Sequence, residues 1–157
     1  MQKIVPFLWF DNQLEEALDF YTSIFKNSKV VDVRRYEDAG PDLESTVLAA
    51  TFQLDGVEFM GMNGGPLYTF SPATSFYVKC ETQGECDELW EKLLEGGEAD
   101  RCGWLRDKYG VTWQIIPTVL DTLFADKDPE KIHRVMEAML QMTKLDIAAL
   151  EKAYAGR

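Results

Sequence analysis

The residue types that most often bind metals or act as nucleophiles are scarce in this chain of 157 residues. It has one histidine, His133, and three cysteines, Cys80, Cys86 and Cys102, with no Cys-x-x-Cys spacing. A structural zinc site is therefore not expected. The 27 acidic residues leave a carboxylate site for Mg²⁺ or Ca²⁺ open, although no loop has the spacing of an EF-hand. We expect neither a bound metal nor a cofactor.

Two residues are candidates for covalent or acid–base catalysis. Cys102 follows Arg101, whose positive charge could activate a thiol, but no histidine lies nearby in the sequence to act as its base. A half-buried strand thiol is the simpler interpretation. Glu58 lies in an apolar segment, where a carboxylate could serve as a general base. The alternative for Glu58 is a side chain that points to solvent at a sheet edge.

Aromatic, methionine and amide side chains recur on the predicted strands, and such residues suit an apolar pocket with a few orienting polar groups. Because side chains alternate along a strand, Gln114 should share one face with Thr112, and Trp113 should lie on the other. For the tryptophans, core packing is the alternative. The predicted ligand-binding residues are Trp9, Met60, Asn63, Cys102, Trp104, Trp113 and Gln114.

The elements that position these residues follow from hydrophobic periodicity. Residues 4–10 predict a strand buried on both faces, and Asn12 with Glu15 predicts the capped start of a helix. Residues 29–36 and 46–54 predict two strands around an acidic loop at 37–42. Asp55-Gly56 predicts a tight hairpin into a strand over 57–62.

The second half repeats this order. It predicts a strand over 75–80, a helix that Thr82 and Glu85 cap and Gly96 ends, and a hairpin of 102–105 with 111–116. Residues 13–20 resemble residues 83–90 at an offset of 70, and residues 55–59 resemble 109–113 at an offset of 54. The shorter offset predicts that the second module lost a length of chain equal to about one strand and a loop.

After Pro117 the pattern is helical, with a short turn over 119–125, a helix that begins at Asp128-Pro129 and another that begins with Thr143 and Asp146. We expect this tail to pack outside the duplicated unit or on a second subunit. The predicted organisation is one α+β domain over residues 1–157. It comprises modules at 1–66 and 67–120 and C-terminal helices at 121–157.

Charge and cysteine content limit the partners and the compartment. The chain has 16 basic and 27 acidic residues, a formal net charge of −11, which disfavours nucleic acid and membrane surfaces as partners. Three cysteines without paired spacing indicate a reducing compartment, not a disulfide framework. With no signal-peptide pattern and no long apolar run, a cytoplasmic protein is expected.

Four segments, together with the repeated strand–helix–three-strand order, carry a resemblance over nearly the whole chain. They are PFLWFD at 6–11, GMNGGP at 61–66, RCGWLRDKYGVTWQ at 101–114 and RVMEAMLQM at 134–142. They resemble the PhnB-like subgroup of the vicinal oxygen chelate superfamily, which includes glyoxalases, ring-cleaving dioxygenases and antibiotic-resistance proteins. The resemblance implies that each βαβββ module forms half of a cup-shaped sheet and that the protein is a homodimer.

The resemblance also implies where a metal would bind. In metal-using relatives the ligands lie on the first and last strands of each module. The matching positions here are Ile4 or Pro6, Met60, Thr74 or Ser75, and Gln114. No histidine or glutamate lies at these positions, so metal-assisted chemistry is not expected. The subgroup is often labelled 3-demethylubiquinone-9 3-methyltransferase, but the glycines at 61–65 match no fingerprint for a nucleotide or methyl donor.

The function expected from the sequence is metal-free binding of a small, partly aromatic molecule. One alternative is a metal-free or weakly metal-dependent lyase or isomerase with Glu58 as its base. A second alternative is a methyltransferase, as the subgroup label suggests. A third is an interaction module that acts through the C-terminal helices.

Overall fold

The computed structural model describes residues 1–35 and 47–157. The acidic loop predicted at 37–42 lies outside these residues. The chain divides into two compact units, Met1–Phe70 and Ser71–Arg157, each with its own sheet.

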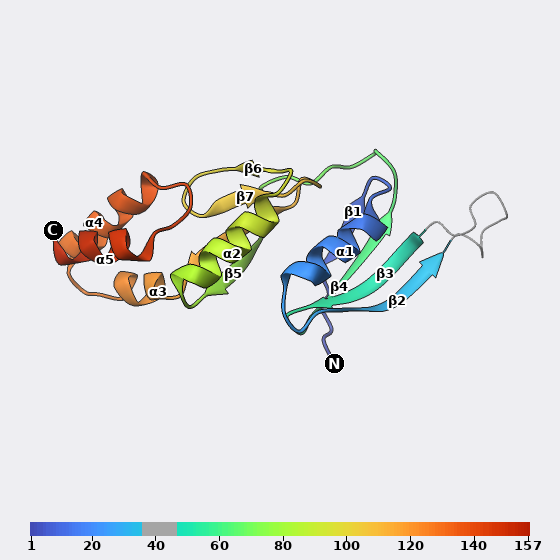
Figure 1. The fold of residues 1–157 in the computed structure, drawn as a ribbon, viewed down its shortest axis with the longest axis horizontal. Helices are drawn as coiled ribbons and strands as arrows, with labels where there is room; N and C mark the ends of the chain where they lie inside the picture. The colour runs from blue at the N-terminus through green and yellow to red at the C-terminus, as the bar shows by residue number, and fades with distance from the viewer. Residues whose placement is uncertain (36–46) are drawn as a thin grey trace. The chain divides into compact units, whose positions relative to one another are not determined.

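The first unit is a four-stranded sheet with one helix (Figure 1). Its elements are β1 (Phe7–Phe10), α1 (Leu14–Ile24), β2 (Lys29–Arg35), β3 (Val47–Leu54) and β4 (Val57–Asn63). The strand order is β1-β4-β3-β2, with β1 parallel to β4 and the other pairs antiparallel. One face of the sheet packs against α1, because Leu14, Ala17, Leu18 and Tyr21 of the helix are buried.

The second unit repeats this plan and adds three helices. Its sheet consists of β5 (Ser75–Cys80), β6 (Glu98–Ala99), β7 (Trp104–Arg106) and β8 (Thr112–Pro117). The helix α2 (Gln83–Leu94) follows β5 in the chain and packs on this sheet. The order β5-β8-β7-β6 matches that of the first sheet. The second module keeps all four strands, so its shortening removed no strand. Part of the shortening lies within the strands, since β6 has 2 residues where β2 has 7.

The pairing register agrees with the sequence offsets. Phe7 pairs with Met60 across β1 and β4, and Tyr77 pairs with Gln114 across β5 and β8. Tyr77 lies 70 residues after Phe7, and Gln114 lies 54 residues after Met60. The two sequence offsets thus connect structurally equivalent positions, and the predicted α+β fold of two βαβββ modules is confirmed.

Several local predictions need correction at the start of the chain. The first strand is not buried on both faces, because Phe7 is 52% exposed. Asn12 is not the cap of α1. Asn12 has a φ of 62°, the residue that directly precedes the helix is Gln13, and the Gln13 side chain makes no capping hydrogen bond to the helix. Both residues of the Asp55-Gly56 hairpin have positive φ, 49° and 78°, as predicted.

The second helix begins as predicted. The Thr82 hydroxyl accepts from the Glu85 backbone N–H at 3.1 Å, and the Glu85 carboxylate accepts from the Glu81 N–H. Cys80 and Cys86, however, form a disulfide, with their Cα atoms 5.5 Å apart. The expectation of unpaired cysteines is wrong for this pair, because the turn at Thr82 folds the start of α2 back onto the end of β5. Cys102 is a free thiol.

The C-terminal helices are α3 (Val119–Phe124), α4 (Pro129–Leu140) and α5 (Ile147–Ala155). Asp128 caps α4 as predicted, whereas α5 begins after its cap Asp146, three residues later than expected. The helices bury a cluster that includes Ile116 of β8, and its other members are Leu120, Leu123, Val135, Leu145 and Leu150. Within the described residues, no helix has the length and apolar character needed to cross a bilayer.

Candidate functional site

The face of the first sheet that points away from α1 carries three of the predicted site residues. Trp9, Met60 and Glu58 share this open face, because paired strand residues lie on the same side and side chains alternate along each strand. Trp9 is fixed at the end of the face, where its indole Nε1 donates to the Gly65 carbonyl at 2.9 Å. A Cβ on Gly64 would lie 2.3 Å from this ring. The glycines at 64 and 65 therefore accommodate an indole.

The catalytic candidate Glu58 is tied to the N-terminal segment through its backbone. The Gln2 side chain accepts from the Glu58 N–H at 3.0 Å and donates to its carbonyl at 2.9 Å. Its cross-strand neighbour is Gln53. These contacts position the strand and do not involve the carboxylate, so a role for Glu58 as a base stays a prediction.

Asn63 lies on the opposite, helix-covered side. It is 7% exposed, and its Oδ1 accepts from the Leu14 backbone N–H at 2.8 Å. The side chain thus satisfies a free donor at the first turn of α1, which the local sequence leaves uncapped. Contact of Asn63 with a ligand stays a prediction, while its capping contact is a structural role that sequence reasoning missed.

We expect Asn63→Ala to lower the free energy of unfolding by about 1–2 kcal/mol, because it leaves a buried N–H without its acceptor. Chemical denaturation monitored by circular dichroism measures this difference. Gln13→Ala is the matched control, since Gln13 precedes α1 but makes no side-chain cap. A larger loss for Gln13→Ala than for Asn63→Ala would contradict the assignment.

The open face of the second sheet, away from α2, carries a row of three residues across adjacent strands. The register aligns Trp104 of β7 with Gln114 of β8, and Gln114 with Tyr77 of β5. The Gln114 amide donates to the Ser75 hydroxyl at 2.9 Å, which orients its carbonyl. Burial, and next the negative charge of Asp121, raise the pKa of Tyr77 above its usual value. Tyr77 is therefore a neutral phenol at physiological pH.

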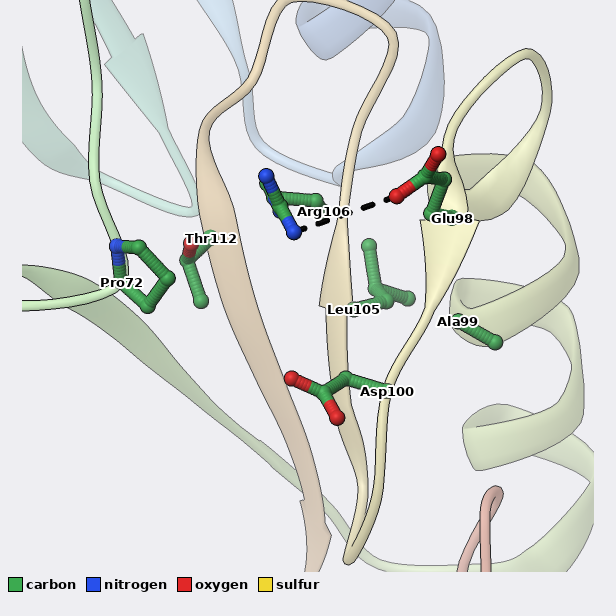
Figure 2. A pocket seen from close by; sticks show the side chains of 7 residues that line it. All are labelled: Pro72, Glu98, Ala99, Asp100, Leu105, Arg106 and Thr112. Carbon is green, nitrogen blue, oxygen red and sulfur yellow. Dashed lines mark ion pairs between the residues drawn. The ribbon is translucent and has the colours of Figure 1, made fainter.

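A second row runs beside the first and borders a cavity. The register aligns Glu98, Arg106, Thr112 and Ser75 across β6, β7, β8 and β5. An ion pair joins Arg106 Nη2 and Glu98 Oε2 at 3.9 Å. A cavity of ≈ 180 Å³ lies at this row, and Figure 2 shows the side chains that line it. Its lining residues are Pro72, Glu98, Ala99, Asp100, Leu105, Arg106 and Thr112.

The other two predicted residues have structural surroundings. Trp113 is 2% exposed on the helix side of β8, and its Nε1 donates to the buried Asp107 carboxylate at 2.9 Å. Cys102 has a φ of 59°, and its backbone N–H donates to the Met142 carbonyl at 2.9 Å. Their contact with a ligand stays a prediction. The structure thus brings Trp104 and Gln114 together, but places Trp113 away from them.

Sequence reasoning missed Tyr77 as a neighbour of Gln114 and Arg106 as a neighbour of Thr112. The alternation along β8 did place Thr112 on the face of Gln114, and the register confirms this. The offset of 70 residues from Phe7 could have identified Tyr77, because Phe7 pairs with Met60 as Tyr77 pairs with Gln114.

Comparison with known proteins gives a family model and several solved structures. The model described as 3-demethylubiquinone-9 3-methyltransferase matches residues 2–116. A PhnB protein from Bacillus cereus, assigned the same description, is 43% identical with a TM-score of 0.69, over 74% of this chain and 100% of that chain. A protein from Pseudomonas aeruginosa is 19% identical with a TM-score of 0.60, over 72% of this chain and 95% of that one.

A more distant structure has the same fold. The fosfomycin resistance protein FosX from Listeria monocytogenes, in complex with Mn(II) and sulfate, is 16% identical with a TM-score of 0.52, over 72% of this chain and 89% of that chain. No curated protein matches the sequence significantly. The family model ends at residue 116, so the expected similarity of the tail at 134–142 lies outside the matched region.

The residues at the positions suggested for a metal do not fit a divalent cation. Met60 offers a thioether, and Ser75 and Gln114 offer a hydroxyl and an amide that already bond to each other. Carboxylate and imidazole ligands, which Mn²⁺ and Zn²⁺ sites commonly use, are missing from these three positions. In the described part of the chain, no three His, Cys, Asp or Glu side chains cluster in a way that could hold a metal.

Proposed function

Because the chain belongs to the family described as 3-demethylubiquinone-9 3-methyltransferase, a PhnB-like branch of the vicinal oxygen chelate superfamily, we propose that it binds a small, partly aromatic molecule without a metal. The proposed site is the open face of the second sheet. Gln114 orients the ligand there, and Trp104 contacts its aromatic part.

The row Trp104–Gln114–Tyr77 is the observation that supports this proposal. Two aromatic side chains flank one amide on adjacent strands, which is the mixture of apolar surface and few polar groups that small-molecule sites use. The hydrogen bond to Ser75 uses one N–H of the Gln114 amide and leaves the carbonyl to accept from a ligand. Tyr77 adds a neutral hydroxyl at the same level of the sheet.

Neither enzyme alternative has a comparable observation behind it. Gly64 and Gly65 accommodate Trp9, so the glycine-rich segment offers no support for binding a methyl donor. The metal-free or weakly metal-dependent lyase or isomerase likewise lacks support, because the contacts of its proposed base Glu58 are made by the backbone and not by the carboxylate. Function through the C-terminal helices is also less well supported, because these helices share a buried cluster with Ile116 of β8.

We expect wild-type protein to carry an organic molecule from cells and Gln114→Leu to lose it, because the substitution keeps the side-chain size and removes the amide. The expected loss of affinity is at least about tenfold, the effect of about 1.4 kcal/mol. Native mass spectrometry of the purified protein, with and without added Mn²⁺, measures both the organic mass and any metal.

Gln53→Leu is the matched control, since Gln53 is a half-buried strand glutamine of the first sheet. It should keep the bound mass at the wild-type occupancy. Equal occupancy in Gln114→Leu would refute the role of Gln114. Stoichiometric metal on the wild-type protein would refute the metal-free proposal.

We also propose that the protein is a homodimer. The first unit leaves several large apolar side chains in solvent, including Ile4 at 89%, Phe7 at 52% and Leu67 at 72% exposure. A second copy of the chain is the partner that would remove such surface from water. Light scattering coupled to size-exclusion chromatography should give twice the chain mass of 17.9 kDa. A monomer at micromolar concentration would contradict the proposal.

A further inference from the structure

We infer that the cavity beside Thr112 binds a small, uncharged group that carries several hydroxyls, as the polar end of the ligand whose aromatic part lies over Gln114. This inference rests on the proposed function and specifies the chemistry of the ligand. The cavity and the aromatic row are adjacent, because Thr112 and Gln114 are two residues apart on the same face of β8.

The size of the cavity limits what it can hold. Its volume of ≈ 180 Å³ is smaller than the roughly 300–1,000 Å³ of sites that enclose a whole ligand. It therefore suits one end of a molecule. Figure 2 shows that the side chains of Arg106, Glu98 and Asp100 supply most of its polar atoms.

Thr112 is the feature that points to a ligand. The residue is 3% exposed, and its Oγ1 has no hydrogen-bond partner among the described residues. A buried hydroxyl without a partner destabilises a protein, and folded proteins retain few such groups. A threonine hydroxyl can both donate and accept. An alcohol can also do both, so it complements the Thr112 hydroxyl in either role.

The charges around the cavity select against an anion. Arg106 contributes one positive charge, while Glu98 and Asp100 contribute two negative charges. With a net charge of −11 on the whole chain, a carboxylate or phosphate would be repelled. A simple cation would instead meet the Arg106 guanidinium. Hydroxyls can accept from Arg106 and donate to the two carboxylates, so a polyol satisfies all three side chains.

Access to Thr112 requires a side chain to move, because its Oγ1 is shielded from water. Arg106 is the residue that we expect to move. Its side chain is 50% exposed, and its ion pair with Glu98, at 3.9 Å, is long. Exposed ion pairs of this kind add little stability, so the rearrangement costs little.

Titration with erythritol, followed by ¹H–¹⁵N NMR on the full chain, tests the inference. We expect saturable shifts of the Thr112 and Arg106 amides, and about tenfold weaker binding in Thr112→Val. The same variant should melt about 2–4 °C higher than the wild type, because it loses an unpaired buried hydroxyl and keeps its shape. Thr22→Val is the matched control and should bind erythritol like the wild type: it removes a threonine hydroxyl of α1 that already has a partner, since the Thr22 Oγ1 donates to the Leu18 carbonyl at 2.7 Å.

Three results would overturn the inference. They are tighter binding of phosphate or acetate than of erythritol, equal erythritol affinity in Thr112→Val, and no saturable shift with erythritol. These three results are distinct from a failure of the proposed function. That failure would be seen as an unchanged organic mass on the Gln114→Leu protein. If Gln114→Leu loses that mass while Thr112→Val binds erythritol like the wild type, the proposed function stands and this inference fails.

Discussion

Asp107→Ala should destabilise the second unit more than loss of the disulfide does. The Asp107 carboxylate is 3% exposed and accepts from three donors. These are the backbone N–H groups of Tyr109 and Val111, at 2.9 and 3.0 Å, and the indole Nε1 of Trp113 at 2.9 Å. One side chain therefore closes the β7–β8 turn and fixes a core tryptophan.

The expected loss is about 3–5 kcal/mol, because three buried donors lose a charged acceptor at once. A typical domain is stable by only about 5–15 kcal/mol, so the loss is a large fraction of the total. Urea denaturation, followed by circular dichroism and by tryptophan fluorescence, measures it. An unfolding midpoint that coincides in the two probes would show that the secondary structure and the tryptophan surroundings are lost in one transition.

Trp113→Phe is the control that separates the turn from the core. It removes the indole donor but keeps an aromatic ring and the two backbone contacts of Asp107. We expect it to cost clearly less than Asp107→Ala. If Asp107→Ala costs less than about 1 kcal/mol, the carboxylate does not organise the hairpin, and its buried hydrogen bonds do not act as a network.

Reduction of the Cys80–Cys86 disulfide should lower the stability by about 2 kcal/mol. The bond closes a short loop between residues six positions apart, and the chain-entropy relation gives this magnitude for so small a ring. For a chain of this size the melting temperature should fall by about 4–8 °C. Differential scanning calorimetry of oxidised and fully reduced protein measures the difference.

The redox state itself can be counted. Cys102 is the free thiol, so oxidised protein that is unfolded without reductant should take one alkylating label, and reduced protein three. Cys102→Ala should remove one label from each form and leave the difference in melting temperature unchanged. Three labels on protein isolated without reductant would show that the bond does not form in the cell, as a reducing compartment would predict.

Contacts between residues close in the sequence could be predicted. The Thr82 cap, the Asp128-Pro129 start and the Asp55-Gly56 hairpin each join residues within a few positions, and local geometry decides such bonds. The alternation along β8 fixed the shared face of Thr112 and Gln114 in the same way. The two sequence offsets also identified the duplicated modules, because equivalent positions in a repeat preserve residue type and spacing.

Weak or long-range features could not be predicted. The two residues of β6, Glu98 and Ala99, carry no periodic signal, and only their pairing with β7 makes them a strand. The Asn63 cap of α1 joins residues 49 positions apart. Nothing near Leu14 in the sequence indicates that its N–H is satisfied by a distant asparagine.

The sequence by itself thus determined the family, the two βαβββ modules and the residue types available for a ligand. The tertiary structure decided which of those residues are neighbours. Strand register aligned Trp104, Gln114 and Tyr77, turned Trp113 toward the core with Asp107, and left the Thr112 hydroxyl beside a cavity. The physical reason is that side-chain alternation is local, whereas the pairing of strands depends on packing and hydrogen bonds summed over the whole sheet.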